Sequence, residues 1–339
     1  MRTPLPASAA VLLATVALPL GAQSYHVTHT YPLGGDGGWD YVTLDTAGHR
    51  LFIARGSRVM VVDPDKGTLL AEIPGLNRAH GVAFSEETGR GFATSGGDSS
   101  VVIFDLTTLE VVGRTTAAPD ADAILYDPAT KRIFTFNGDS HNASVLDAAT
   151  GRKLGSVDLG AGPEFGVSAG DGNLYVNLED KSAVAEIDAA TMKVTRTWSL
   201  APCESPTGLA IDRAHHRLFS GCRNKVMAIS DAVLGKVVAT EPIGQGVDAC
   251  RFDPGTQLAF ASTGDGGISV IREDAPDRYT VAGSVPTKRG ARTMEIDLRT
   301  HRLFTVTADF GPMPAATPDH PRPRPPVLPG TFALLELDP

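Results

Sequence analysis

Short apolar stretches alternate with turn-forming residues along almost the whole chain. The stretches are rich in Val, Ile, Phe and Thr, and Gly, Asp, Asn and Pro stand between them. This pattern is typical of antiparallel β-strands joined by tight turns. No helical period of useful length is present, so the sequence predicts an all-β protein.

The pattern repeats at a nearly constant spacing. One apolar run in each repeat ends 40 to 44 residues after the previous one, near Asp45, Ser85, Asp127, Gly170, Asp212, Asp253 and Asp297. Repeats of about 40 to 50 residues with four strands each are typical of propeller blades. The sequence therefore predicts one domain, residues 24–339, folded as a seven-bladed β-propeller with four-stranded antiparallel blades.

The two ends of this domain complement each other. The seventh repeat ends with a third strand at Phe332 to Leu337, and an extra strand-like stretch, Tyr25 to Leu33, precedes the first repeat. We expect the N-terminal stretch to pair with the last blade as its outermost strand. The pairing would close the ring and cover an edge that otherwise invites aggregation.

The first residues have the pattern of an export signal. A positive start at Met1 and Arg2 precedes an apolar stretch over residues 7–20 and small or short residues at 21–23. Later apolar runs fall well short of the ~20 residues that a membrane-spanning helix needs. The sequence thus predicts a signal peptide at 1–23, no transmembrane segment, and a periplasmic or secreted mature protein.

Composition and charge narrow the class of partner. The 339 residues are 42% hydrophobic and 20% charged, with a formal net charge of −9. No run of basic residues offers an electrostatic footprint for a phosphate backbone. Nucleic acid is therefore not expected as a partner.

The repeat units themselves resemble a known family. The segments RLFIARGSRVMVVDPDKGTLLAEI and GRGFATSGGDSSVVIFDLTTLEVVG are similar to the repeat of the YncE-like, or YVTN-repeat, family of exported β-propellers. The related WD-repeat pattern fits less well, because its Gly-His and Trp-Asp marks do not recur. The resemblance covers nearly the whole mature chain and implies the fold and the compartment. It implies no catalytic residue, because the family shares no single activity.

Polar residues open the innermost strand of most repeats. Alignment of the repeats places Asp40, His80, Asp122, Phe165, Thr207, Asp248 and Arg292 at one position, with Trp39 and Glu164 one residue earlier. Inner strands of a propeller start at the same mouth of its central channel, so these side chains are expected to form a ring there. The predicted ligand-binding set is Trp39, Asp40, His80, Asp122, Glu164, Asp248 and Arg292.

This ring suits two kinds of function. The leading hypothesis is a propeller that binds a small molecule or an envelope protein at the polar mouth. The alternative is a metal-dependent enzyme of the lactonase or lyase type, with His80 or Glu164 as general base and Arg292 stabilising negative charge. Its divalent metal, the one candidate cofactor, would be held by residues drawn from Asp40, His80, Asp122 and Asp248.

Other histidines and a serine motif are interpreted structurally. His49, His216 and His301 share one repeat position, a turn on the face opposite the ring. We expect His215 and His216 in such a turn to be solvated side chains rather than ligands. The segment Gly166 to Gly170 spells GxSxG, but it aligns with inner strands of other repeats and lacks the strand–turn–helix context of a serine-hydrolase elbow.

The last blade contains a Pro-rich insertion at residues 309–330, which holds eight of the 24 prolines. This density of proline favours an extended path without internal hydrogen bonds. The insertion lies on the ring face in the repeat pattern, where Arg322 and Arg324 would bring positive charge. A lid, a contact for a partner and a plain loop are all compatible with this pattern.

The three cysteines include one expected pair. Cys203 precedes the first strand of the fifth repeat and Cys222 ends its second strand, so both reach the ring face within one hairpin. An exported chain permits disulfides, and we predict a Cys203–Cys222 bond. Cys250 lies inside an inner strand and is expected to be a buried small apolar residue.

Overall fold

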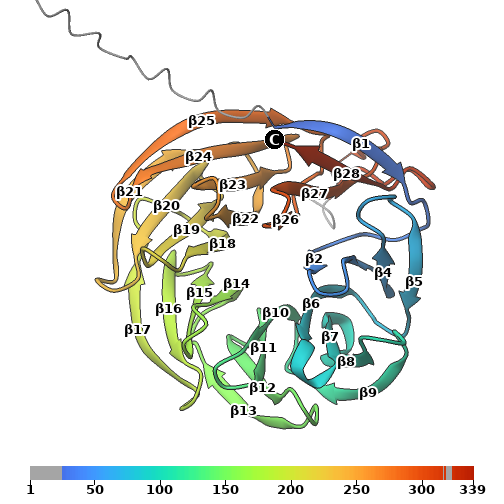
Figure 1. The fold of residues 1–339 in the computed structure, drawn as a ribbon, viewed down its shortest axis with the longest axis horizontal. Coiled ribbons are helices and arrows are strands. Elements are labelled where there is room, and N and C mark those ends of the chain that lie inside the picture. Colours follow the sequence, from blue (N-terminus) through green and yellow to red (C-terminus); the bar gives the residue numbers. More distant parts are fainter. Residues whose placement is uncertain (1–24, 316, 318–322) are drawn as a thin grey trace, which may run out of the picture.

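The computed structural model describes residues 25–315, 317 and 323–339, so the predicted signal peptide at 1–23 lies outside the described residues. Over the described residues the chain forms seven four-stranded antiparallel sheets set around a central axis (Figure 1). The prediction of a seven-bladed β-propeller is confirmed. In blades 1 to 6 the strands follow the chain order from the axis outward.

Each of the first four blades is built from four consecutive strands. Blade 1 contains β2 (Val42–Asp45), β3 (Arg50–Arg55), β4 (Arg58–Val62) and β5 (Leu69–Ile73). Blade 2 contains β6 (Ala79–Ser85), β7 (Arg90–Ser95), β8 (Ser100–Asp105) and β9 (Val111–Thr116). Blade 3 contains β10 (Ala121–Asp127), β11 (Arg132–Asn137), β12 (Asn142–Asp147) and β13 (Lys153–Asp158). Blade 4 contains β14 (Pro163–Ser168), β15 (Asn173–Leu178), β16 (Ala183–Asp188) and β17 (Lys193–Ser199).

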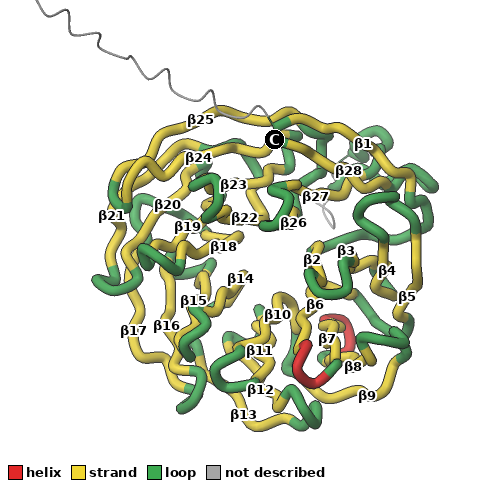
Figure 2. The backbone as a smooth tube through the Cα atoms, in the orientation of Figure 1, coloured by secondary structure: helices red, strands yellow, loops and turns green. Residues whose placement is uncertain are grey.

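The remaining three blades complete the ring. Blade 5 contains β18 (Pro206–Asp212), β19 (Arg217–Cys222), β20 (Val226–Asp231) and β21 (Lys236–Pro242). Blade 6 contains β22 (Val247–Asp253), β23 (Leu258–Thr263), β24 (Gly267–Ala275) and β25 (Arg278–Pro286). Blade 7 contains β26 (Met294–Asp297), β27 (Arg302–Thr307), β28 (Ala333–Asp338) and β1 (His26–Pro32). Short loops join the strands, and two single turns of 3-10 helix, η1 (Glu86–Thr88) and η2 (Gly96–Asp98), flank β7 (Figure 2).

The ring closes through its two terminal strands. β1 pairs antiparallel with β28 from His26 opposite Asp338 to Pro32 opposite Ala333. Figure 1 shows the blue first strand lying outside the red last one. The predicted closure is confirmed, and the outer edge of β28 is covered.

One aromatic position supports the packing of every blade. The third residue of the second strand is aromatic in all seven blades: Phe52, Phe92, Phe134, Tyr175, Phe219, Phe260 and Phe304. Six of these rings are 0% exposed and Tyr175 is 7% exposed. Full burial of a Phe side chain contributes about 1.5–3 kcal/mol relative to exposure, so this repeated position is a main source of the stability of the ring.

The histidine turns lie where the repeat pattern placed them. His49, His216 and His301 have left-handed φ angles of 51°, 55° and 63°, as turn residues do. His215 lies on the same kind of turn with its side chain 39% exposed, and its Nδ1 lies 2.6 Å from Asp212 Oδ2. The carboxylate is buried beneath the turn and fixes the ring.

The Pro-rich insertion is anchored at both described ends. Gly311 N donates to Pro326 O at 2.8 Å, and Leu328 N donates to Asp309 O at 2.8 Å. These bonds flank a β-bridge between Phe310 and Val327. The ends therefore form a short two-stranded stem, while Arg322 lies outside the described residues.

Candidate functional site

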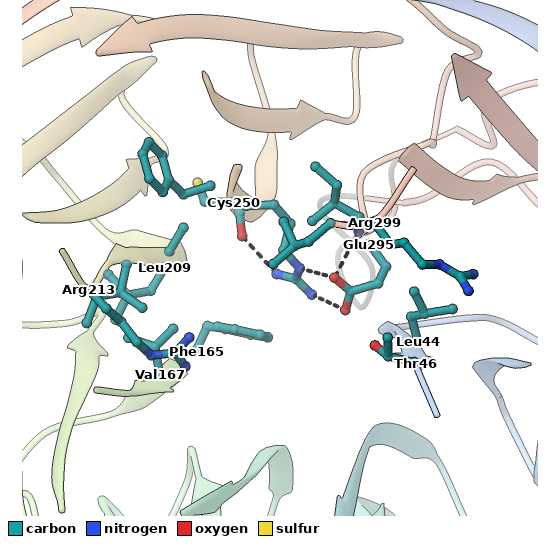
Figure 3. Close-up of a pocket in the computed structure, with 15 residues that line it drawn as sticks. Leu44, Thr46, Phe165, Val167, Leu209, Arg213, Cys250, Glu295 and Arg299 are labelled. Atoms are coloured by element: carbon teal, nitrogen blue, oxygen red, sulfur yellow. Dashed lines mark hydrogen bonds and ion pairs between the residues drawn. The ribbon is translucent and has the colours of Figure 1, made fainter. Parts of the chain in front are cut away.

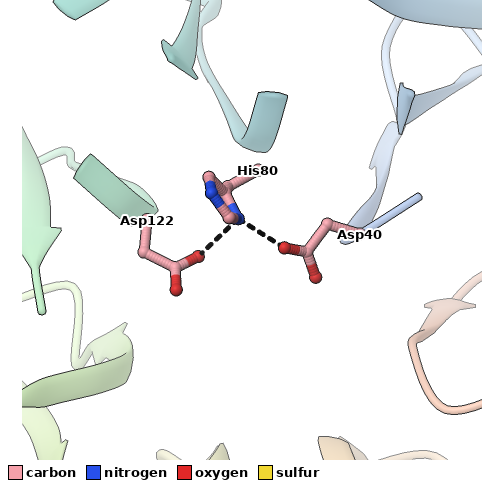
Figure 4. Close-up of side chains that lie close together, drawn as sticks. All are labelled: Asp40, His80 and Asp122. Carbon is pink, nitrogen blue, oxygen red and sulfur yellow. Dashed lines mark hydrogen bonds and ion pairs between the residues drawn. The ribbon is translucent and has the colours of Figure 1, made fainter. Parts of the chain in front are cut away.

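The first strands of the blades bring the predicted ring residues to one mouth of the channel. Three of them form a compact cluster: His80 Nδ1 lies 2.5 Å from Asp40 Oδ2 and 3.2 Å from Asp122 Oδ1. The imidazole stands between the two carboxylates, each from a different blade (Figure 4). The three potential ligand atoms all lie within 4.8 Å of one another.

This cluster, the Asp–His–Asp cluster, is poorly solvated. The side chain of His80 is 9% exposed and that of Asp122 is 22% exposed. Asp122 Oδ1 has no hydrogen-bond partner among the described residues, although it faces His80. Burial lowers the pKa of His80, but the hydrogen bond with Asp40 and the charge of Asp122 outweigh burial and raise the pKa. Burial and the charge of Asp40 raise the pKa of Asp122 to about 7.

A second group of charges lies beside the cluster. Arg292 Nη1 is 2.7 Å from Asp248 Oδ2, and its Nη2 is 3.8 Å from Asp40 Oδ1. The guanidinium therefore links the Asp–His–Asp cluster to Asp248. Burial still raises the pKa of Asp248 to about 6, despite the opposing effect of Arg292. Arg324, at the described end of the Pro-rich insertion, also lowers this pKa and so contributes positive charge to the mouth.

The opposite side of the mouth contains a pair of acids that the repeat alignment only half identified. Arg223 Nη1 lies 2.8 Å from Glu179 Oε1, and Nη2 lies 3.9 Å from Glu164 Oε1. Burial and the neighbouring Glu179 raise the pKa of Glu164. Glu179 follows the end of β15 rather than opening an inner strand, so no alignment of strand starts could find it.

A disulfide lies next to Arg223, the residue that contacts both of these acids. The predicted Cys203–Cys222 bond is confirmed, with an S–S distance of 2.01 Å. Arg223 directly follows Cys222, and its backbone N donates to Glu204 O at 3.0 Å. The disulfide therefore holds in place the loop that carries Glu204 and the backbone from which the Arg223 side chain extends. Its presence is consistent with an exported protein.

Not every predicted ring residue points into the mouth. The Trp39 ring packs against Phe332 and Phe310, with centroid distances of 5.3 and 6.0 Å. Thr207 is buried and its hydroxyl donates to Val247 O at 2.9 Å. These two residues support neighbouring blades, so the charged part of the ring consists of the acids, His80 and Arg292.

Two rings from opposite blades form the floor of the mouth. Tyr41 of blade 1 and Phe165 of blade 4 meet with their centroids 5.3 Å apart. Tyr41 is buried, and burial together with the charge of Asp122 raises its pKa. Beneath them Arg251 stacks over Phe165 at 5.1 Å. These two rings therefore meet across the axis of the propeller next to the Asp–His–Asp cluster.

A cavity lies on the other side of these two rings. It measures about 440 Å³ and is lined by the far ends of the inner strands, among them Leu44, Val167 and Ile296 (Figure 3). Its central polar groups are Arg251 and Glu295, joined at 2.8 and 3.2 Å. These charges satisfy each other, whereas Asp122 Oδ1 in the mouth accepts no hydrogen bond from a described residue, so the mouth is the stronger candidate site.

The GxSxG segment forms no nucleophile elbow. Ser168 ends the inner strand β14, and its hydroxyl donates to Asp127 Oδ1 at 2.8 Å. The next regular element is β15, so a strand follows where the elbow requires a helix.

Comparisons with known proteins agree with this architecture. No protein-family model matches the chain. The chain is 26% identical over 144 residues to the uncharacterized protein YncE of Salmonella typhi, a match that covers 42% of this chain and 29% of YncE. The match thus spans less than a third of the length of this relative.

Solved structures show the same fold at low identity. The hydrazine synthase of Kuenenia stuttgartiensis superposes with a TM-score of 0.68 and 14% identity, over 86% of this chain and 95% of that chain. The protein U3-55K superposes with a TM-score of 0.73 and 10% identity, over 93% and 99%. Among the described residues no helix is long and apolar enough to cross a membrane. The partial match to YncE and the seven-bladed ring together support the placement of this chain among the YncE-like β-propellers.

Proposed function

We propose that this protein is exported to the periplasm or the medium and binds a divalent cation, and through it a small anionic ligand, at the mouth of the propeller. The observation that carries the proposal is the Asp–His–Asp cluster. Two carboxylates and an imidazole nitrogen converge within 4.8 Å, and these are ligand types that divalent transition metals accept.

The charge balance of the mouth supports a bound cation. Five carboxyl groups, those of Asp40, Asp122, Asp248, Glu164 and Glu179, lie close to three basic side chains, those of His80, Arg223 and Arg292. Burial and the neighbouring carboxylate of Asp40 both disfavour ionisation and raise the pKa values of Asp122 and Asp248. A divalent cation would remove this repulsion and hold the acids in their ionised form.

The surroundings favour a small anion as the further ligand. The side chains of Arg292 and Arg223 are 38% and 58% exposed, and both contact acids of the mouth. A carboxylate or phosphate group could contact the cation and a guanidinium together, because arginine binds such groups in a bidentate manner.

Metal titration of the mature protein tests this proposal. Wild type, stripped of metal, should bind Mn²⁺ or Zn²⁺ in calorimetry, and Asp122→Asn should lose the mouth site while it keeps its far-ultraviolet spectrum. Asp139→Asn is the matched control, an exposed acid of the same blade. Equal metal binding by wild type and Asp122→Asn would overturn the proposal, and a mouth that binds only a protein would appear as partner capture without metal.

One observation favours catalysis at the same site. The carboxyl groups of Glu164 and Glu179 both lie beside the guanidinium of Arg223, and burial raises the pKa of Glu164. A buried carboxyl group that keeps its proton can act as a general acid beside a metal. This supports a lactonase- or lyase-like enzyme as the second candidate function.

The enzyme hypothesis predicts metal-dependent turnover. Metal-loaded wild type should hydrolyse or cleave members of a lactone and uronate-type panel, and Glu164→Gln should reduce kcat by about 10²-fold or more. Metal binding should remain in this variant. Full metal occupancy without turnover on the whole panel would leave the binding function and exclude this form of the enzyme hypothesis.

A further inference from the structure

The outer hairpin of blade 6 reaches further than the hairpins of the preceding blades. Its strands β24 and β25 have nine residues each, and they pair as far as Ala275 opposite Arg278. The tip contacts the β18–β19 turn of blade 5, where Arg217 Nε donates to Pro276 O at 2.8 Å. This extension brings Glu273 beside the turn that carries Asp212 and His215.

Glu273 occupies a position that is apolar in blades 1 to 5. In the strand register Arg272 pairs with Leu258 as Asp231 pairs with Arg217, so Glu273 corresponds to Ala232. The equivalent residues of blades 1 to 5 are Pro64, Leu106, Ala148, Ala189 and Ala232, all of them buried. A carboxylate at such a position is costly unless something compensates its charge.

The described groups around Glu273 compensate its charge only in part. The side chain of Glu273 is 1% exposed, and neither of its carboxylate oxygens has a hydrogen-bond partner among the described residues. The nearest acid, Asp212, has a side chain that is 2% exposed. The nearby guanidinium of Arg217 is already engaged, with Asp231 at 3.0 Å and Asp277 at 2.9 Å.

The histidine completes a set of ligand atoms. His215 Nδ1 lies 2.6 Å from Asp212 Oδ2 and 3.4 Å from Glu273 Oε1. All three atoms fall within 4.8 Å of one another. In a tetrahedral zinc site the ligand atoms lie about 3.3 Å apart, given metal–ligand bonds of about 2.0–2.2 Å. The Glu273 contact has this spacing already, and the Asp212 contact needs to open by less than about 1 Å.

We propose that Asp212, His215 and Glu273 form a second divalent-cation site, separate from the mouth, which binds Zn²⁺ or Mn²⁺ and joins blade 5 to blade 6. The imidazole ligand favours these ions over Mg²⁺ and Ca²⁺, which prefer all-oxygen sites. The side chain of His215 is 39% exposed, so an ion can enter from solvent. This site lies at the end of the inner strand β18, on the face opposite the Asp–His–Asp cluster.

Thermal unfolding in a mouth-site variant isolates this second site. In the Asp122→Asn background, metal-free protein should gain on the order of 5 °C in Tm at a Zn²⁺ concentration about 100 times the Kd. Mg²⁺ at the same concentration should have no such effect. The test set adds Glu273→Ala and His215→Ala, each in the same background.

The Glu273→Ala variant is expected to fold, because blades 3 to 5 carry alanine at this position. Its metal-free Tm should equal or exceed that of the parent, and its response to Zn²⁺ should be lost. His215→Ala should lose the response as well, and a metal analysis should show one equivalent fewer than in the parent protein.

Two results would overturn the proposal. One is a Zn²⁺ response in Glu273→Ala equal to that of the parent. The other is a parent that gains no stability from Zn²⁺ or Mn²⁺ while Glu273→Ala is simply more stable, which would mean that Asp212 and Glu273 share a proton. The mouth site is tested separately: if it does not bind metal, wild type and the Asp122→Asn variant will bind the same amount of metal.

Discussion

In the metal-free protein, the carboxyl groups of Asp122 and Asp248 at the mouth lie where their ionised form is unfavourable. Asp122 is buried beside Asp40, and its pKa of about 7 lies far above the value of about 3.9 in an unfolded chain. A group with a raised pKa contributes to stability at a pH below its unfolded pKa, and this contribution is lost as the pH rises through the folded pKa. The pKa of Asp248 is raised in the same direction.

The pH dependence of unfolding tests this account. Between pH 4 and pH 8 the free energy of unfolding of metal-free wild type should fall, and the share that Asp122→Asn removes should be on the order of 3 kcal/mol. Denaturant titrations at several pH values measure this difference. Asp139→Asn, exposed in the same blade, should keep the wild-type slope. A slope unchanged by Asp122→Asn would contradict the burial effect described for this carboxyl.

At the scale of elements, the hairpin of blade 5 is tied to the mouth. The disulfide joins the loop before β18 to the end of β19, across a sequence separation of 19 residues. It holds the backbone from which Arg223 reaches Glu179. A local covalent link thus supports a charged contact of the candidate site.

Removal of the disulfide should affect stability and the mouth together. The double variant Cys203→Ser/Cys222→Ser should lose about 3 kcal/mol of unfolding free energy in the chain-entropy model. Ligand or metal binding should weaken, because Arg223 and Glu179 are less firmly placed. Reducing agent provides the control: it should lower the stability of wild type to that of the variant and leave the variant unchanged. Identical stability of both proteins without reductant would disprove the expected contribution.

On the scale of the whole molecule, ring closure depends on one strand from the far end of the sequence. β1 supplies the fourth strand of blade 7 and covers β28, whose Leu337 is fully buried. Without β1 the propeller would present an unpaired edge, and such edges promote association between chains.

Replacement of residues 26–32 by a Gly–Ser segment tests the closure. The variant should lose at least about 3 kcal/mol, from the broken ladder and its apolar contacts, and should associate at high concentration. Chemical unfolding and sedimentation measure the two effects. A Gly–Ser segment added before residue 24 serves as control and should change neither. A replaced variant that stays monomeric at wild-type stability would show that β1 contributes little to closure.

The alternation of apolar runs and turns was sufficient to predict the blades, their number and the closing strand. Each blade is a local unit whose strands are consecutive in the chain, so the fold follows from a periodic pattern. Cys203 and Cys222 were predictable for the same reason, since both belong to one hairpin. The strand starts likewise placed Asp40, His80 and Asp122 at one mouth.

Contacts between residues of different blades could be identified only from the tertiary structure. Strand periodicity gives the direction of a side chain but not its distance from a residue three blades away. Only the assembled ring shows that Trp39 turns to Phe332, that Tyr41 meets Phe165 across the axis, and that Glu179 joins Glu164. The placement of Glu273 beside Asp212 and His215 likewise could not be predicted, because it depends on the length of the β24–β25 hairpin.

The sequence by itself therefore determined the architecture, the ring of polar strand starts and the disulfide, because these follow from local periodicity and from neighbours along the chain. The tertiary structure alone decided which charges are buried together, which of them lack hydrogen-bond partners and which aromatic rings meet across the axis. The physical reason is that burial and electrostatic energy depend on distances between blades, which the repeat pattern does not encode.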